Sequence, residues 1–124
     1  IGTHVPFHAT ASGKTFLASL TKRNRGRMLE ALELSMHTRN TFKQADDLSK
    51  ELDQIAEQGY ALDRQEFMEG MIAIAVPVMD HRGRYHASIA VHGPLPRLTE
   101  EKAIARKDLL LAASKRLTQT LFNG

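Results

Sequence analysis

The chain has no cysteine and no tryptophan among its 124 residues, and aromatic side chains make up only 6% of them. Without cysteine it has neither a disulfide framework nor a thiolate metal site, which agrees with a reducing compartment and favours a cytoplasmic protein. No apolar run reaches the length of about 20 residues that a membrane span needs, and no signal peptide is visible. We therefore expect no membrane association.

A strong excess of one charge is also missing. Seventeen Lys and Arg against fourteen Asp and Glu leave a net charge of +3, and the basic residues are spread out except at Lys22–Arg27. So mild a charge is a poor argument for nucleic-acid binding by this chain. Apolar residues make up 42%, enough for the modest core of a single domain.

The central feature of the chain is a predicted β-hairpin. Nine apolar residues, Met71–Met79, form its first strand, and the polar segment Asp80–Gly83 forms the turn. The second strand, Arg84–His92, alternates between apolar and polar residues. A Gly-Pro pair ends this strand, because proline cannot donate a hydrogen bond to a neighbouring strand.

Alternation gives this hairpin two different faces. Successive side chains point to opposite sides of a strand, and a four-residue turn pairs odd positions of the first strand with even positions of the second. One face is bulky and suited to packing under helices. The other is small and partly polar, and the strands alone favour a closely packed helix or solvent above it over a binding site. The small face carries Ala73, Ala75, Ser88, Ala90 and His92, and the bulky face carries Ile72, Ile74, Val76, Val78, Tyr85, Ala87, Ile89 and Val91.

The remaining patterns predict helices and short strands around the hairpin, which together make an α+β fold. From the N-terminus we expect an extended segment at Ile1–Phe7, helices at His8–Leu20 and Thr21–Leu34, and a loop or edge strand at Ser35–Phe42. A helix from Asp46 or Asp47 to its cap Gly59 and a strand at Tyr60–Leu62 follow. The last helix is capped by Thr99 and runs to about Phe122, with a buried stripe at Ala103, Leu110, Ala113, Leu117 and Leu121.

The first of these helices begins with small residues. Thr10 or Ser12 is its expected N-cap, and the free N–H groups of such a start either bind an anion or pack tightly against the sheet. Gly13-Lys14-Thr15 invites comparison with a phosphate-binding loop. However, His8 stands where that motif needs its first glycine, and no buried strand precedes it, so nucleotide hydrolysis is excluded.

No arrangement of residues predicts an enzyme. The six histidines form no ligand-like pair, and His86 and His92, on one strand face, lie about 20 Å apart by strand rise. We therefore predict a non-enzymatic domain without a cofactor.

Four segments resemble motifs of IclR-type transcriptional regulators, in the order and with the spacing of that family. Pro6–Ala18 resembles "PLHATAxGKAxLA", Gln58–Asp63 resembles "QGYAxD", Gly70–Asp80 resembles "GxxxIAAPVFD", and Gly93-Pro94 with Arg97-Leu98-Thr99 matches "GP..RLT". The resemblance covers nearly the whole chain.

The resemblance implies an effector-binding domain with a curved antiparallel sheet and flanking helices, similar to GAF domains. Residues 1–124 would form this domain, incomplete on its N-terminal side. The winged helix-turn-helix that contacts DNA in the family has no counterpart here. An incomplete sheet exposes an edge that favours pairing with another chain, and a homodimer or tetramer is expected.

The resemblance also implies a pocket for a small molecule, between the sheet and the start of the first helix. Backbone N–H groups near that start would hold a carboxylate of the effector, Asp63 would accept from a hydroxyl, and His92 could donate to a carboxylate. Several family members have serine at the positions of Ala90 and His92, so this pocket departs from theirs. Because some members hold zinc in the pocket, a metal-sensing domain is one alternative, and a purely structural dimerisation module is another. The few aromatic residues favour a small aliphatic effector. The implied ligand-binding residues are Ala11, Ser12, Gly13, Asp63, Met71, Ala73, Ala90 and His92.

Overall fold

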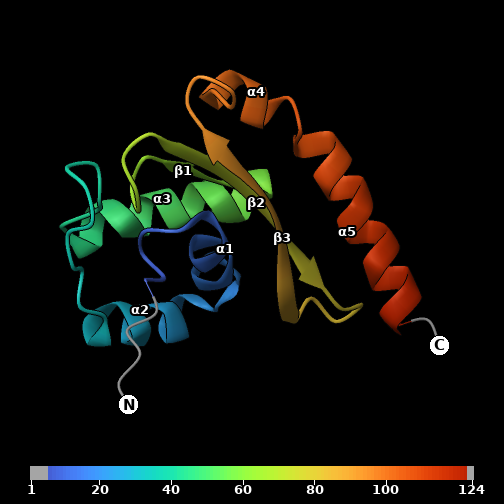
Figure 1. Cartoon of the computed structure of the whole chain (residues 1–124). Coiled ribbons are helices and arrows are strands. Elements are labelled where there is room, and N and C mark those ends of the chain that lie inside the picture. Colours follow the sequence, from blue (N-terminus) through green and yellow to red (C-terminus); the bar gives the residue numbers. More distant parts are fainter. Residues whose placement is uncertain (1–5, 123–124) are drawn as a thin grey trace, which may run out of the picture.

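A computed structural model describes residues 6–122 of the chain, so most of the extended segment expected at Ile1–Phe7 lies outside the described residues. The described part is a three-stranded antiparallel sheet with helices on both sides (Figure 1). Its elements in chain order are α1 (Ala11–Ser19), α2 (Lys22–Ala31), α3 (Ala45–Gln58), β1 (Ala61–Arg64), β2 (Met71–Met79), β3 (Tyr85–Pro94), α4 (Glu100–Ile104) and α5 (Lys107–Phe122).

The strands lie in the order β1-β2-β3, and their register confirms the two predicted faces. Ala73 lies opposite Asp63 of β1 and also opposite His92 of β3, so these three side chains form one row across the sheet. Ala75 lies opposite Ala90 in the same way. We call this small-sided surface the open face.

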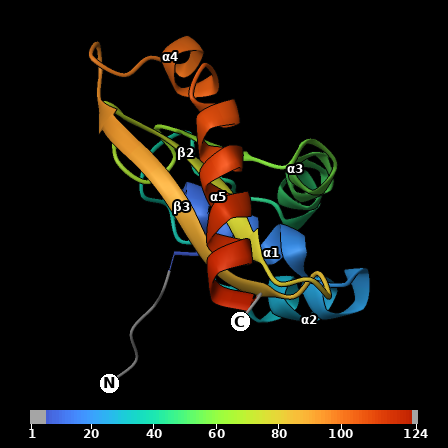
Figure 2. The ribbon, with the colours of Figure 1, turned by 90° about the vertical axis from the view of Figure 1, so that its right-hand side faces the viewer.

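Helices α1 and α3 lie on the side of the open face, and α4 and α5 lie on the other side (Figure 1 and Figure 2). The core under α1 and α3 includes Leu17, Leu48 and Leu52 together with Ala75 of the sheet. On the opposite surface, which we call the closed face, Ile74 and other bulky β2 side chains are buried against the C-terminal helices. The bulky and small faces therefore pack as their side-chain volumes predict.

The prediction that Tyr85 lies on the bulky face is wrong, because the hairpin contains a β-bulge. The register shifts between Val78 and Met79, so that Tyr85 lies opposite Met79 instead of continuing the alternation. One extra residue reverses the side to which every following side chain points. The Tyr85 ring packs edge-on against Phe16 of α1 at 5.3 Å, and its hydroxyl is 2.6 Å from Ser88 Oγ.

The predicted helix caps are present. Thr10 Oγ1 accepts from the Gly13 N–H at 3.0 Å, so Thr10 rather than Ser12 is the N-cap of α1. Thr99 caps α4 in the same way, and Gly59 ends α3 in a left-handed conformation with φ of 88°. Helix α2 begins one residue later and ends three residues earlier than predicted, and the segment after it is a loop rather than a strand.

The predicted last helix is divided in two at Ala105 and Arg106, and its buried stripe is wrong at the C-terminal end. Leu117 is 39% exposed and Leu121 is 60% exposed. Strand β1 pairs with β2 only as far as Ala75, so the following edge of β2 is free of a strand, and α5 lies along it. Polar groups make this contact: Ser114 Oγ donates to Pro77 O at 2.6 Å, and Thr118 Oγ1 donates to Met79 O at 2.7 Å.

Candidate functional site

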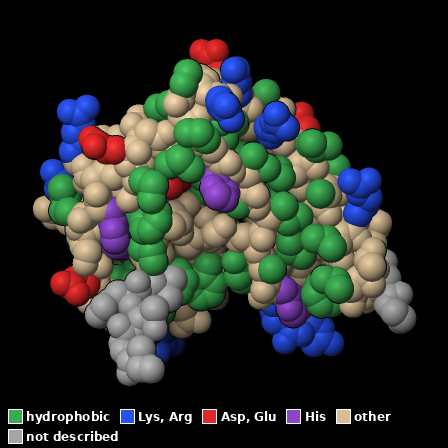
Figure 3. All heavy atoms as spheres, viewed as in Figure 1, with side chains coloured by type: hydrophobic (Ala, Val, Ile, Leu, Met, Phe, Trp, Pro, Cys, Tyr) green, Lys and Arg blue, Asp and Glu red, His purple; other side chains and the backbone are tan. Residues whose placement is uncertain are grey.

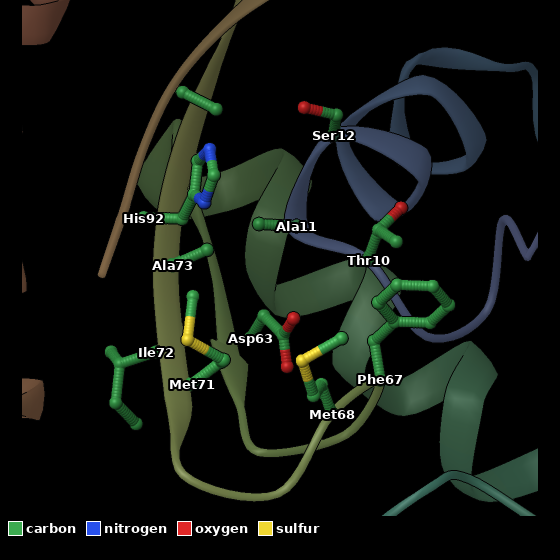
Figure 4. A pocket seen from close by; sticks show the side chains of 11 residues that line it. Thr10, Ala11, Ser12, Asp63, Phe67, Met68, Met71, Ile72, Ala73 and His92 are labelled. Carbon is green, nitrogen blue, oxygen red and sulfur yellow. The ribbon is translucent and has the colours of Figure 1, made fainter. Parts of the chain in front are cut away.

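A cavity of about 320 Å³ lies between the start of α1, the open face of the sheet and the β1–β2 connection (Figure 4). Its lining is mostly apolar, with polar groups contributed by the helix start, by β1 and by β3. The lining residues are Thr10, Ala11, Ser12, Asp63, Phe67, Met68, Met71, Ile72, Ala73, Ala90 and His92.

Seven of the eight residues that we expected to bind a ligand line this cavity. They are Ala11, Ser12, Asp63, Met71, Ala73, Ala90 and His92. Gly13 is not among the lining residues: a Cβ atom there would lie 2.6 Å from Phe7 Cα, so this glycine allows α1 to approach the preceding segment. The arrangement brings the expected residues together, and ligand binding by them stays a prediction.

The start of α1 forms the helical wall of the cavity. The first N–H groups of a helix cannot reach a carbonyl within the helix, and here only short side chains, Ala11 and Ser12, stand beside them. The macrodipole adds a partial positive charge at this end. A small anionic group can therefore approach the backbone of this wall.

Asp63 supplies the carboxylate of the cavity. Only 6% of this residue is exposed, and its Oδ1 accepts from the Glu66 N–H at 2.8 Å. Burial raises the pKa of Asp63, while hydrogen bonding to the backbone and the nearby Lys14 cation oppose that rise. The side chain is thus a fixed hydrogen-bonding group inside a mostly apolar space.

A buried lysine holds the segment that carries Asp63. Lys14 of α1 is fully buried, and its Nζ donates to Leu62 O at 2.6 Å, to Glu66 Oε1 at 2.7 Å and to Glu51 Oε2 at 3.0 Å. Burial raises the pKa of Glu66, and Lys14 opposes that rise. This ion-pair network joins α1, α3 and the β1–β2 connection under the cavity. Sequence reasoning considered Lys14 only for phosphate binding and missed its structural role.

The β1–β2 connection contributes Phe67 and Met68, which sequence reasoning also missed. Thr41 Oγ1 donates to Glu66 O at 2.6 Å, which fastens the connection to the loop after α2. The Phe67 ring lies 5.1 Å from the ring of His37. Phe67 and Met68 are 37% and 55% exposed, so this wall is the outer side of the cavity. A short polar segment before a strand carried no periodic signal that would have identified them.

An antiparallel sheet flanked by helices, with a half-open apolar cavity at the start of one helix, defines an α+β domain whose cavity has the features of a small-molecule site. The family described as bacterial transcriptional regulator IclR C-terminal matches residues 1–119. The chain belongs to this family.

Curated relatives agree with this assignment. The probable transcriptional regulator SauR of Cupriavidus necator is 42% identical over 115 residues, which cover 92% of this chain and 46% of that protein. The transcriptional regulator KdgR of Escherichia coli is 34% identical, covering 95% of this chain and 45% of KdgR. The chain thus spans about half the length of these relatives. These relatives, and the family to which the chain belongs, are transcriptional regulators and not enzymes.

Solved structures of the family have the same fold. A double mutant of the inducer-binding domain of the PobR transcription factor from Acinetobacter, in complex with 3-hydroxybenzoic acid, matches with a TM-score of 0.89 at 27% identity, covering 98% of this chain and 70% of that one. The C-terminal domain of KdgR matches with a TM-score of 0.84 at 34% identity, with 95% and 72% covered. The predicted α+β effector-domain fold is confirmed.

Two further observations concern metal and membrane. Within residues 6–122, no group of three or more His, Cys, Asp or Glu side chains is arranged to hold a metal ion. The absence of a zinc cofactor from the pocket stays a prediction. In the same part of the chain, every helix is too short or too polar to cross a bilayer.

Proposed function

We propose that this chain is the effector-sensing domain of a DNA-binding transcriptional regulator, and that its pocket binds a small carboxylate. The observation that carries the proposal is the cavity between the start of α1 and the open face, which combines helix N–H groups, His92 and Asp63 with apolar walls. Membership of a family of transcriptional regulators supports the same function.

Signalling would follow from oligomer rearrangement. A bound effector that contacts α1, β1 and β3 together stabilises one relative arrangement of these elements, and it shifts a population between states only by its difference in affinity for them. In a cytoplasmic homodimer or tetramer, that shift would alter DNA contacts made by a domain elsewhere in the protein.

A thermal-shift panel on the protein in its full natural length tests this function. The panel contains small aliphatic carboxylates, aromatic acids and zinc. A ligand at one hundred times its dissociation constant stabilises the folded state by about 2.7 kcal/mol, which moves the melting temperature by several degrees. A selective shift by one class of acid is expected. Elemental analysis of untreated protein tests the absence of zinc.

The substitution Ala73→Phe locates the binding site. A phenyl ring on Ala73 fills the cavity between Asp63 and His92, so the shift produced by the acid is expected to vanish while the protein stays folded. Ala112→Phe adds the same ring at an exposed position of α5 and is the matched control. An unchanged shift in Ala73→Phe would contradict the pocket assignment.

The alternative of a dimerisation module has one observation in its favour. Hydrophobic side chains gather on the right of Figure 3, where α5 and β3 lie in the same view of Figure 1. On α5, Leu109 is 63% exposed and Leu121 is 60% exposed. If no acid and no metal shifts the melting temperature, this purely structural role becomes the better explanation.

A further inference from the structure

The pocket has two chemically different ends, and they lie in one row of the sheet. We propose that it selects a short hydroxy acid, with the hydroxyl donating to Asp63 and the carboxylate bound by His92. This inference rests on the proposed function, because it assumes that the pocket binds a small carboxylate.

The sheet register sets the separation of the two ends. Asp63 and His92 both lie opposite Ala73, one on each side of β2. Two strand spacings place their Cα atoms roughly 10 Å apart. The Ala73 methyl group leaves the space between them open, and both side chains line the cavity. A ligand that bridges them must span the gap over Ala73, with one polar group at each end.

Electrostatics decide which end binds which group. Asp63 is the negatively charged group of the lining, and neither Lys nor Arg lines the cavity. A carboxylate placed against Asp63 would meet a like charge in a poorly hydrated space, whereas a hydroxyl donates to it. Asp63 is almost fully buried, its Oδ1 already accepts from the Glu66 N–H, and burial raises its pKa. A hydroxyl donor replaces part of the water that burial removes from this carboxylate.

His92 is at the opposite end, on the same side as the helix start. In Figure 4, Ser12 and His92 lie toward one end of the view, and Asp63, Met68 and Phe67 lie toward the other. His92 is exposed at the edge of the cavity, where its ring N–H can reach an acid. An acidic group at this end also faces the positive end of the α1 dipole.

The walls between the two ends accept hydrocarbon. Met71 of β2 and Phe67 and Met68 of the connection surround the space over Ala73. Thioether side chains adapt to irregular shapes, so both an aliphatic chain and an aromatic ring fit. A space of about 320 Å³ holds a molecule the size of a hydroxybenzoate.

Two matched pairs of acids test the selection on the protein in its full natural length. The pairs are 3-hydroxybenzoate with benzoate and 4-hydroxybutyrate with butyrate, and isothermal titration calorimetry gives each dissociation constant. In at least one pair the hydroxy acid is expected to bind about tenfold more tightly, the effect of one hydrogen bond to a charged group.

Variants then assign the two ends. Asp63→Asn is expected to reduce the preference for the hydroxy acid to below about threefold without weakening the plain acid. His92→Ala is expected to weaken both acids about tenfold and to leave their ratio unchanged. Asp108→Asn removes an exposed α5 carboxylate and is the control. The melting temperature of each unbound variant verifies that it is folded.

The outcomes separate this inference from the proposed function. Equal affinity within both pairs, or loss of both acids in Asp63→Asn with the fold intact, overturns the hydroxy-acid selection and leaves the carboxylate sensor standing. If other acids bind but no member of either pair does, the hydroxy-acid selection is likewise overturned and the carboxylate sensor stands. If no acid of the wider panel binds at all, the proposed function fails as well.

Discussion

The open and closed faces of the sheet lie on the same three strands, but they are stabilised by different interactions. On the closed face, Ile74 and Val76 are fully buried among other branched side chains under α4 and α5. On the open face, alanines leave a cavity, and a buried lysine with its carboxylate partners holds the surrounding segments. Side-chain volume fills the closed side, whereas the open side combines an apolar core under α1 and α3 with paired charge beside the cavity.

This difference shows how one small domain combines stability with a binding site. Dense apolar packing excludes voids, so a cavity beside it has to be supported by groups that do not fill the space. Lys14 does this: its Nζ donates to Leu62 O of β1 and to Glu66 Oε1 of the β1–β2 connection. The cavity therefore depends on the ion-pair network, whereas the closed face depends on side-chain volume.

The largest expected effect is that of removing the buried lysine. Lys14→Met leaves Glu66 without its cation and Glu51 with only Arg64, at 3.7 Å. Breaking a buried pair on one side costs about 3–5 kcal/mol in the free energy of unfolding. Urea denaturation at pH 7 measures it. The double variant Lys14→Met/Glu66→Gln is expected to recover part of the loss, because it removes a stranded charge. A loss below about 1 kcal/mol would show that the network is not what supports the open face.

A cavity made on the closed face is expected to have the next largest effect. Ile74→Ala removes a fully buried side chain, which costs about 3 kcal/mol by the loss of apolar burial and the void left behind. Urea denaturation measures the loss, and calorimetry with the acid that binds wild type is expected to give an unchanged dissociation constant at a temperature where the variant is folded. A selective loss of affinity in Ile74→Ala would remove the distinction between the two faces.

The burial of Asp63 on the open face predicts how the free energy of unfolding depends on pH. Burial raises the pKa of Asp63 above 3.8, so the folded state binds this proton more tightly than the unfolded state. The stability that protonated Asp63 contributes is fully present below the unfolded pKa and is lost as the pH rises through the folded pKa. Relative to wild type, Asp63→Asn is therefore expected to become more stable between pH 4 and pH 7, by less than about 1.4 kcal/mol for each unit of the pKa shift.

Urea denaturation of both proteins at several pH values measures this difference. Asp80 at the hairpin tip has the opposite pH dependence, because a hydrogen bond from His86 and backbone N–H donors lower its pKa. The stability that ionised Asp80 contributes is present above pH 3.8 and is lost as the pH falls through the folded pKa. If the difference between Asp63→Asn and wild type declines from pH 4 to pH 7, the carboxyl is not destabilised by burial.

Alternation along two strands was enough to predict much of the open face. That Ala73 and His92 share one face follows from an even turn and a period of two, and both line the cavity. Tyr85 was misplaced because a bulge reverses that alternation, and the sequence near Met79 carries no mark of it.

Other parts of the site depend on contacts between distant segments. Lys14 is buried because Glu51 and Glu66, 37 and 52 residues away along the chain, converge on it. Phe67 and Met68 belong to a connection whose position is fixed by Thr41 of another loop. No local pattern contains such information. The leucine stripe of α5 failed for a related reason, since helical periodicity does not tell how far the sheet extends beneath Leu121.

The smallest effect is expected where α5 meets the edge of β2. Ser114 is buried, and its hydroxyl donates to Pro77 O at 2.6 Å, in place of the strand that would otherwise satisfy this edge. Ser114→Ala leaves that carbonyl without its donor and is expected to cost about 1 kcal/mol in urea denaturation. Thr120→Ala removes an exposed hydroxyl from the same helix and is the control. Because neither Ser114 nor Pro77 lines the cavity, the affinity for an acid is expected to stay unchanged. A loss near 3 kcal/mol would mean that hydrogen bonds, and not only volume, hold α5 to the sheet.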